Sequence, residues 1–139
     1  MNDAAIQTTS LEPDGEWFQP LRRELGLTSF GINQITLAPK KRLRVHLHEL
    51  QEEVYLVLEG ELTLIVEGEE HRLGRGTLAR VAPKHRRQLT NPGSEQVVVL
   101  ALGGSGEHES RDARAWSSWD EEGEGRSPQD VPLPDDLPA

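Results

Sequence analysis

Residues 52–76 have the sequence EEVYLVLEGELTLIVEGEEHRLGRG, in which short runs of β-forming residues are separated by turn residues. The first run is rich in valine and tyrosine and ends at Glu59-Gly60. Branched and aromatic side chains fit the pleated surface of a sheet, whereas glycine accepts the positive φ of a tight turn. Short strands at regular spacing predict an all-β sandwich or barrel.

The same pattern continues on both sides of this stretch. Apolar and polar residues alternate over 30–37, and the run 97–102 is almost continuously apolar, which predicts a strand buried on both faces. Pro83 and the turn at 91–93 would end two further strands. The expected strands cover residues 30–37, 42–48, 53–58, 61–66, 69–73, 77–82, 86–90 and 97–102.

The two ends of the chain differ from this centre. We expect residues 1–28 to form an N-terminal arm, with a short helix over Glu16–Leu25 that Gly26 ends. Residues 29–103 form the expected barrel. Residues 104–139 form an acidic, proline-rich tail, because proline cannot be placed inside a regular helix or a central strand.

The C-terminal tail is predicted to be extended, and either docked on the barrel or partly disordered. Trp116 and Trp119 are three residues apart, which favours one face of a helix over residues 111–119. We expect both indole rings to anchor the tail on the barrel.

Composition bounds the class of protein. The 139 residues suit a single domain, and the chain has no cysteine for a disulfide. A net charge of -9 argues against nonspecific nucleic-acid binding, which needs cationic side chains. The apolar runs are too short to cross a membrane, and the first residues lack the pattern of a signal peptide. We therefore expect a cytoplasmic protein with no nucleic-acid or membrane partner.

Two basic clusters interrupt this acidic sequence. They consist of Lys40, Lys41, Arg42 and Arg44, and of Lys84, His85, Arg86 and Arg87. Such clusters are either solvated loop charge or a cationic rim that attracts an anionic small molecule. The sequence leaves both interpretations open.

A candidate metal site follows from His46, His48 and Glu53. Two residues apart on a strand, the imidazoles project from the same face, and a hairpin return would bring the carboxylate beside them. Two histidines and one carboxylate form a facial ligand set for a divalent first-row metal and leave positions open for water, oxygen or substrate. The alternative is a chance pair of solvent-exposed histidines.

The spacing His46-x-His48-x4-Glu53-x6-Gly60 resembles the first motif of the cupin superfamily. Gly76, Pro83 and Asn91 resemble part of the second motif, and the resemblance covers about residues 30–102. It implies a double-stranded β-helix, or jelly-roll, barrel that commonly holds iron, manganese, zinc, nickel or copper. It also implies a homodimer.

The sequence departs from this family at two positions. Lys40 stands where the first motif usually has glycine, and Arg87 stands where the family has a histidine as fourth metal ligand. Arginine stays protonated and offers a metal no lone pair. Either water takes the fourth place, or His85 substitutes, or the metal is lost and Arg87 binds an anion or pairs with Glu53. His85 and Arg87 are thus candidate pocket residues. Tyr55, which has the same strand parity as Glu53, and the polar Gln88 are two more.

The sequence thus predicts a metal-binding cupin domain that is a dioxygenase or isomerase for a small polar or anionic molecule. A non-catalytic, metal-free binding module with Arg87 in its pocket is the main alternative. A purely structural or interaction barrel is the third hypothesis.

Overall fold

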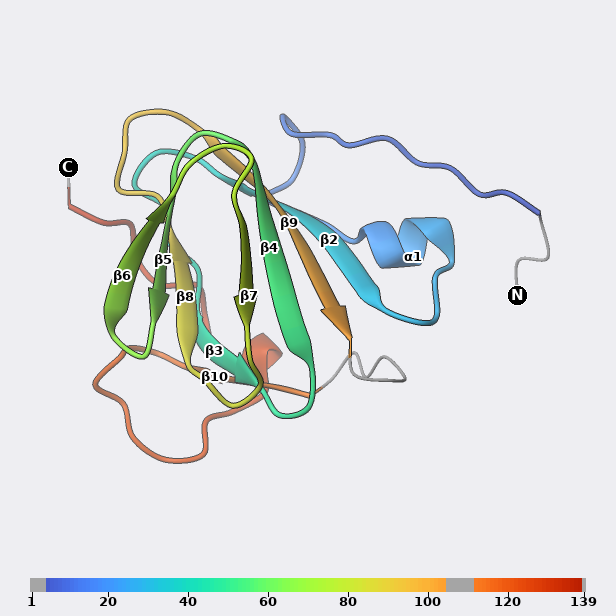
Figure 1. The fold of residues 1–139 in the computed structure, drawn as a ribbon. Coiled ribbons are helices and arrows are strands. Elements are labelled where there is room, and N and C mark those ends of the chain that lie inside the picture. The colour runs from blue at the N-terminus through green and yellow to red at the C-terminus, as the bar shows by residue number, and fades with distance from the viewer. Residues whose placement is uncertain (1–4, 105–111, 139) are drawn as a thin grey trace.

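The computed structural model describes residues 5–104 and 112–138, which form two five-stranded antiparallel sheets lying against each other (Figure 1). The first sheet contains, in spatial order, β1 (Phe18–Gln19), β2 (Gly31–Leu37), β9 (Val97–Gly104), β4 (Glu52–Glu59) and β7 (Leu78–Val81). The second contains β10 (Ala113–Trp116), β3 (Val45–His48), β8 (Arg87–Thr90), β5 (Leu62–Val66) and β6 (Glu69–Leu73). Successive strands mostly alternate between the sheets, which is a jelly-roll arrangement and confirms the predicted fold class.

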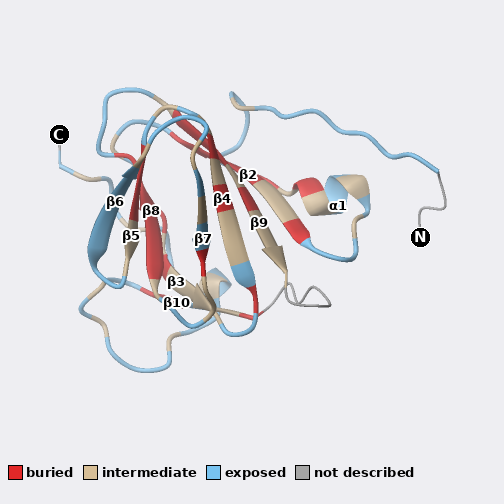
Figure 2. Cartoon of the chain, viewed as in Figure 1, coloured by how far each residue is buried: buried red, intermediate tan, exposed pale blue. Residues whose placement is uncertain are grey.

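The hydrophobic core lies between the two sheets (Figure 2). Its position explains why buried apolar residues recur at every second position along several strands. Tyr55 and Val57 of β4 and Leu62 and Leu64 of β5 are buried on the inner faces. Along β9, the residues Val97–Val99 are all buried, as the continuous apolar run predicts. By contrast, β6 lies at a sheet edge and is mostly exposed.

The N-terminal helix is shorter than predicted. Helix α1 comprises only Leu21–Leu25 and ends at Gly26, whose φ of 68° is left-handed. Phe18–Gln19 instead pair with β2 as strand β1. Pro20 explains the boundary, because a proline disfavours helical backbone in the residue before it.

The predicted helix over 111–119 is wrong for the described part of that range; Arg111 lies outside it. Ala113–Trp116 form β10, which pairs antiparallel with the edge of β3. The three-residue tryptophan spacing is compatible with a helix, but β3 offers backbone hydrogen-bond partners that local sequence cannot reveal. Trp116 is buried beneath Arg86, whose guanidinium lies 3.8 Å from the ring centroid.

The C-terminal segment lies on the first basic cluster. It contains the 3-10 helix η1 (Pro128–Asp130) and buries Val131. Lys41 forms an ion pair with Asp136, and the backbone amide of Leu137 donates to the carbonyl oxygen of Lys40. Arg42 donates to the carbonyl oxygen of Asp135, and Arg44 donates to that of Val131. Among the described residues, no helix combines the length and hydrophobicity that crossing a bilayer requires.

Candidate metal centre

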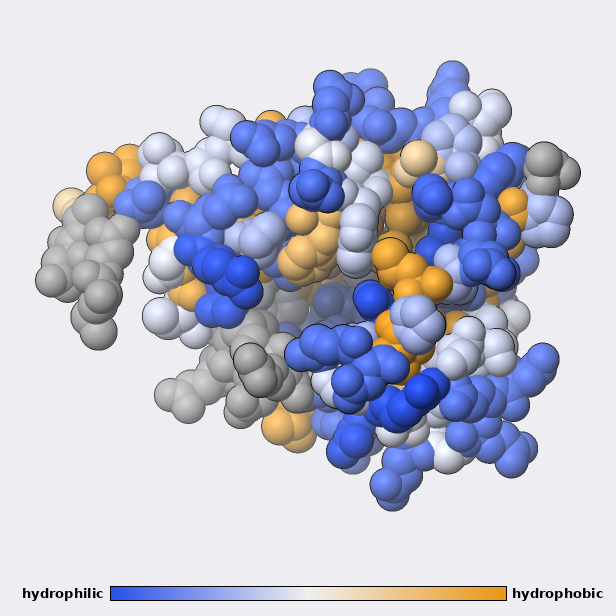
Figure 3. All heavy atoms as spheres, turned by 180° about the vertical axis from the view of Figure 1, so that it is seen from behind, coloured by the Kyte–Doolittle hydropathy of each residue, from blue (hydrophilic) through white to orange (hydrophobic). Residues whose placement is uncertain are grey.

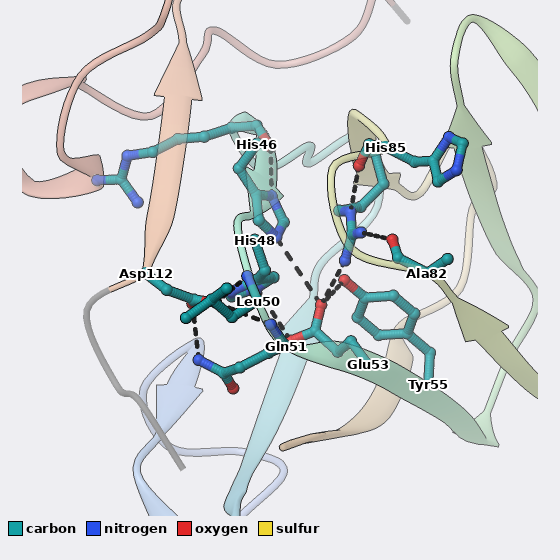
Figure 4. A network of polar contacts seen from close by, with 11 residues as sticks. His46, His48, Leu50, Gln51, Glu53, Tyr55, Ala82, His85 and Asp112 are labelled. Atoms are coloured by element: carbon teal, nitrogen blue, oxygen red, sulfur yellow. Dashed lines mark hydrogen bonds and ion pairs between the residues drawn. The ribbon is translucent and has the colours of Figure 1, made fainter. Parts of the chain in front are cut away.

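Three candidate ligands meet inside the barrel. His46 and His48 come from β3 and Glu53 from β4, and Figure 4 shows the three side chains pointing toward one another. The Nε2 atom of His48 lies 3.3 Å from Oε2 of Glu53, and Nε2 of His46 lies 4.0 Å from Oε1. One ligand atom from each residue lies within 4.8 Å of the others.

The route by which the chain brings Glu53 to the histidines differs from the predicted hairpin. Strands β3 and β4 belong to opposite sheets and are not paired with each other. The connection between them therefore crosses the end of the barrel. Glu53 approaches the imidazoles from the facing sheet, which leaves all three groups between the two layers.

The orientation of each imidazole is set by an acceptor at its Nδ1 atom. Nδ1 of His46 lies 3.2 Å from the carbonyl oxygen of Arg44, and Nδ1 of His48 lies 2.9 Å from Oδ1 of Asp112. Both acceptors require Nδ1 to carry the proton in the neutral ring. The Nε2 lone pairs are therefore left for a metal ion.

Asp112 is a buried partner of the candidate ligand His48 that the sequence analysis missed. Its carboxylate accepts hydrogen bonds from the backbone amides of Leu50 and Gln51 and from the Gln51 side chain, besides that from His48. It thereby joins β10 to the connection that follows β3. Asp112 lies 64 positions from His48, so no local spacing could reveal the contact.

Arg87 and Tyr55 hold the other side of Glu53. Oε1 of Glu53 accepts hydrogen bonds from the Tyr55 hydroxyl and, at 3.1 Å, from the Arg87 guanidinium. Arg87 is fully buried and also donates to the carbonyl oxygens of Ala82 and His85. Oε2 of Glu53 thus remains directed toward His48.

Two adjoining cavities reach this group of residues. The aromatic cavity, of about 270 Å³, is lined by Trp17, Phe18 and Tyr55 together with His46, His48 and Glu53. The arginine cavity, of about 510 Å³, is lined by Arg22 and Arg23 of α1 and shares Phe18, Asn33, His48 and Glu53 with the first. Figure 3 shows the back of the molecule hollowed near its centre, with hydrophilic groups inside and hydrophobic groups beside them.

The cupin domain model matches residues 33–103, about half of the chain. This chain belongs to the cupin family. The match contains all three candidate ligands and ends before β10, so Asp112 lies outside the part of the cupin that the family model describes. No curated protein matches the sequence.

Solved cupin structures share this fold. A sugar phosphate isomerase from a cupin superfamily, from Silicibacter pomeroyi, is 27% identical with a TM-score of 0.61, covering 71% of this chain and 64% of that protein. A candidate sugar phosphate isomerase from Acidithiobacillus ferrooxidans is 27% identical with a TM-score of 0.60, covering 69% and 62%. This cupin therefore spans less than two thirds of either protein. A cupin protein from Bacteroides fragilis is 23% identical with a TM-score of 0.66. The alignment covers 73% of this chain and 86% of that protein.

The protonation states inside this cupin follow from burial and pairing. Burial lowers the pKa of His46 to about 4. Burial alone would also lower the pKa of His48, but the hydrogen bond and charge of Glu53, with the bond to Asp112, raise it. Burial would raise the pKa of Glu53, yet the two imidazoles and Arg87 lower it to about 2. Near neutral pH the site contains a neutral His46 and an ionised Glu53.

The donor set fits a divalent transition metal. Two imidazole nitrogens and a carboxylate oxygen lie within 4.8 Å of one another, and these are ligand types that such ions bind. Arg87 interacts with Oε1 of Glu53, so Oε2 remains available beside the Nε2 atom of His48. At the sequence position where the cupin motif would place a fourth ligand, Arg87 instead forms an ion pair with Glu53.

Two predicted pocket residues lie elsewhere. His85 is exposed, and its ring points away from the metal ligands (Figure 4), so it cannot act as the fourth ligand in this arrangement. Gln88 is buried on the opposite face of β8, where it donates to the Leu43 carbonyl oxygen and accepts from the Trp119 indole. The cause is strand alternation, because Arg87 faces the interior and its neighbour must face outward.

Proposed function

We propose that this cupin binds one divalent transition metal ion through His46, His48 and Glu53 and acts on a small polar or anionic molecule in the adjoining cavities. The observation that carries the proposal is the orientation of the imidazoles. Each ring has its Nδ1 atom at an acceptor and its Nε2 atom toward Glu53, which is the arrangement a metal ligand needs.

We propose isomerisation as the reaction, because two of the similar structures are named as sugar phosphate isomerases. A bound divalent ion supplies Lewis acidity that polarises a carbonyl or enolate oxygen. The protein supplies the rest: Asp112 orients His48, Tyr55 and Arg87 fix the Glu53 carboxylate, and the apolar wall of the aromatic cavity excludes water. This division of roles favours a small substrate held beside the metal ligands.

Elemental analysis of protein purified without a histidine tag tests the proposal. We expect about one transition-metal ion per chain, or its return when Mn²⁺, Fe²⁺, Zn²⁺, Ni²⁺ or Cu²⁺ is added after chelation. His48→Ala should weaken the metal affinity at least about tenfold, because it removes a direct ligand. The matched control is His85→Ala, which removes an exposed imidazole near the site and should bind as wild type does.

Protein that neither contains nor rebinds a metal ion contradicts the proposal. In that case the alternative is a non-catalytic, metal-free binding module, which the buried Arg87–Glu53 ion pair favours because it already neutralises the carboxylate. The variant Arg87→His separates the two. It places an imidazole beside Glu53, so a gain of metal binding by this variant alone would support the metal-free alternative for the natural sequence.

A further inference from the structure

The arginine cavity has an unusual charge for this acidic protein. The chain has a net charge of -9, yet Arg22 and Arg23 lie side by side on this wall. Glu53 is the only acidic residue among the described residues that line the cavity, and it is already paired with Arg87 and His48. Apart from His48, the other polar lining side chains are the neutral amides of Asn33, Gln51 and Gln129.

The two guanidinium groups lack carboxylate partners in the described part of the chain. Arg22 donates only to the carbonyl oxygen of Leu27, at a long 3.4 Å, and neither arginine forms an ion pair there. The adjacent acid, Glu24, accepts hydrogen bonds from Thr9 and Gln19 instead. Their donors are thus available to a ligand that enters the cavity.

The basic clusters that stand out in the sequence are already engaged. Lys41, Arg42 and Arg44 hold the C-terminal segment. In the second cluster, Arg86 donates to the Glu121 carbonyl oxygen and Arg87 is fully buried beside Glu53. Neither cluster lines the arginine cavity, whose cationic side chains in the described part of the chain are Arg22 and Arg23 of α1.

We propose that Arg22 and Arg23 bind the phosphate or carboxylate group of a small anionic ligand whose other end reaches His48 and Glu53. The inference rests on the proposed function, because it assigns the substrate class of the same site. The arginine cavity is lined by His48 and Glu53 as well as by Arg22 and Arg23, so one molecule inside it can touch both ends. Guanidinium groups suit this role because they bind oxyanions with paired, charge-assisted hydrogen bonds.

Titration with inorganic phosphate, and separately with acetate, tests the proposal in metal-free and metal-loaded protein. We expect phosphate or acetate to bind in both states, and the tighter of the two identifies the oxyanion. Arg22→Gln combined with Arg23→Gln should weaken that binding at least about tenfold, because two charge-assisted hydrogen-bond donors are lost. The metal content and the melting temperature of this variant should match those of the wild type.

The control is Arg72→Gln combined with Arg75→Gln, which removes the same charge from an exposed hairpin. Equal weakening by both pairs would show a general charge effect and overturn the proposal. Binding that survives in the Arg22 and Arg23 variant, or that needs the metal and ignores both pairs, overturns it as well. If no metal binds but phosphate still requires Arg22 and Arg23, the proposed metal function fails while the anion site stands.

Discussion

Asp112 shows how one side chain outside the cupin motif can determine the state of a motif residue. It is almost completely buried and accepts four hydrogen bonds, from His48, Leu50 and Gln51. These bonds lower the pKa of Asp112 despite the opposing effect of its burial. The carboxylate therefore stays ionised and keeps the Nδ1 proton of His48 in place.

Asp112→Asn should lower the metal affinity about 10- to 100-fold, because an amide cannot hold the imidazole as a carboxylate does. It should also lower the free energy of unfolding. The NH₂ group of asparagine cannot accept the hydrogen bonds that Leu50 and Gln51 donate to the carboxylate. Metal titration and urea unfolding measure the two effects. The control is Glu49→Gln, an exposed neutralisation in the same connection, and an equal loss of affinity there would contradict the assigned role.

At the level of elements, the turn between β4 and β5 depends on Gly60. Its φ of +77° is left-handed, and a Cβ atom at this position would overlap the carbonyl oxygen of Gln96. Gly68, in the turn between β5 and β6, has a similar φ of +81° but open space around it. A side chain at Gly68 would therefore meet only the strain of a left-handed backbone. A side chain at Gly60 would meet that strain and also a clash with the neighbouring backbone.

We expect Gly68→Ala to cost about 1–2 kcal/mol, the penalty of a left-handed alanine. Gly60→Ala should cost clearly more, because the Gln96 backbone must also move. Urea unfolding of the two variants under the same conditions gives the comparison. Similar losses for both would mean that the chain relieves the clash at Gly60 without disturbing β9.

For the whole molecule, the buried site makes stability depend on pH. The pKa of His46 falls from 6.5 to about 4 on folding, so the unfolded chain takes up a proton first as the pH is lowered. Acidification between these values therefore favours unfolding. The lowered pKa of Glu53, about 2 against 4.5, extends the same trend to lower pH, whereas the raised pKa of His48 opposes it.

Comparison of the metal-free wild type with His46→Asn isolates the first contribution. The stability of the wild type relative to this variant should fall by about 1.4 kcal/mol per pH unit between pH 6.5 and 4. Chemical unfolding across this range measures the slope. A pH-independent difference between the wild type and His46→Asn would refute the coupling.

Local pattern was enough to predict the eight central strands, β2 to β9, the turns between them and the three candidate ligands. Alternation over 30–37 and the glycine turns act through neighbouring residues, and the spacing from His46 to Glu53 belongs to a recognisable motif. The helix predicted over Glu16–Leu25 was too long, because Pro20 delays its start. The helix predicted over 111–119 was wrong, because the free edge of β3 pairs with Ala113–Trp116 as a strand.

Only the tertiary structure decided how the site is completed. The Asp112–His48 contact, the outward turn of Gln88 and the cavity beside Arg22 join segments that are far apart in sequence. It also decided that the conspicuous basic clusters hold the tail and Glu53. The physical reason is that secondary structure depends on neighbouring residues, whereas a buried charge is satisfied by whichever partner the fold brings beside it.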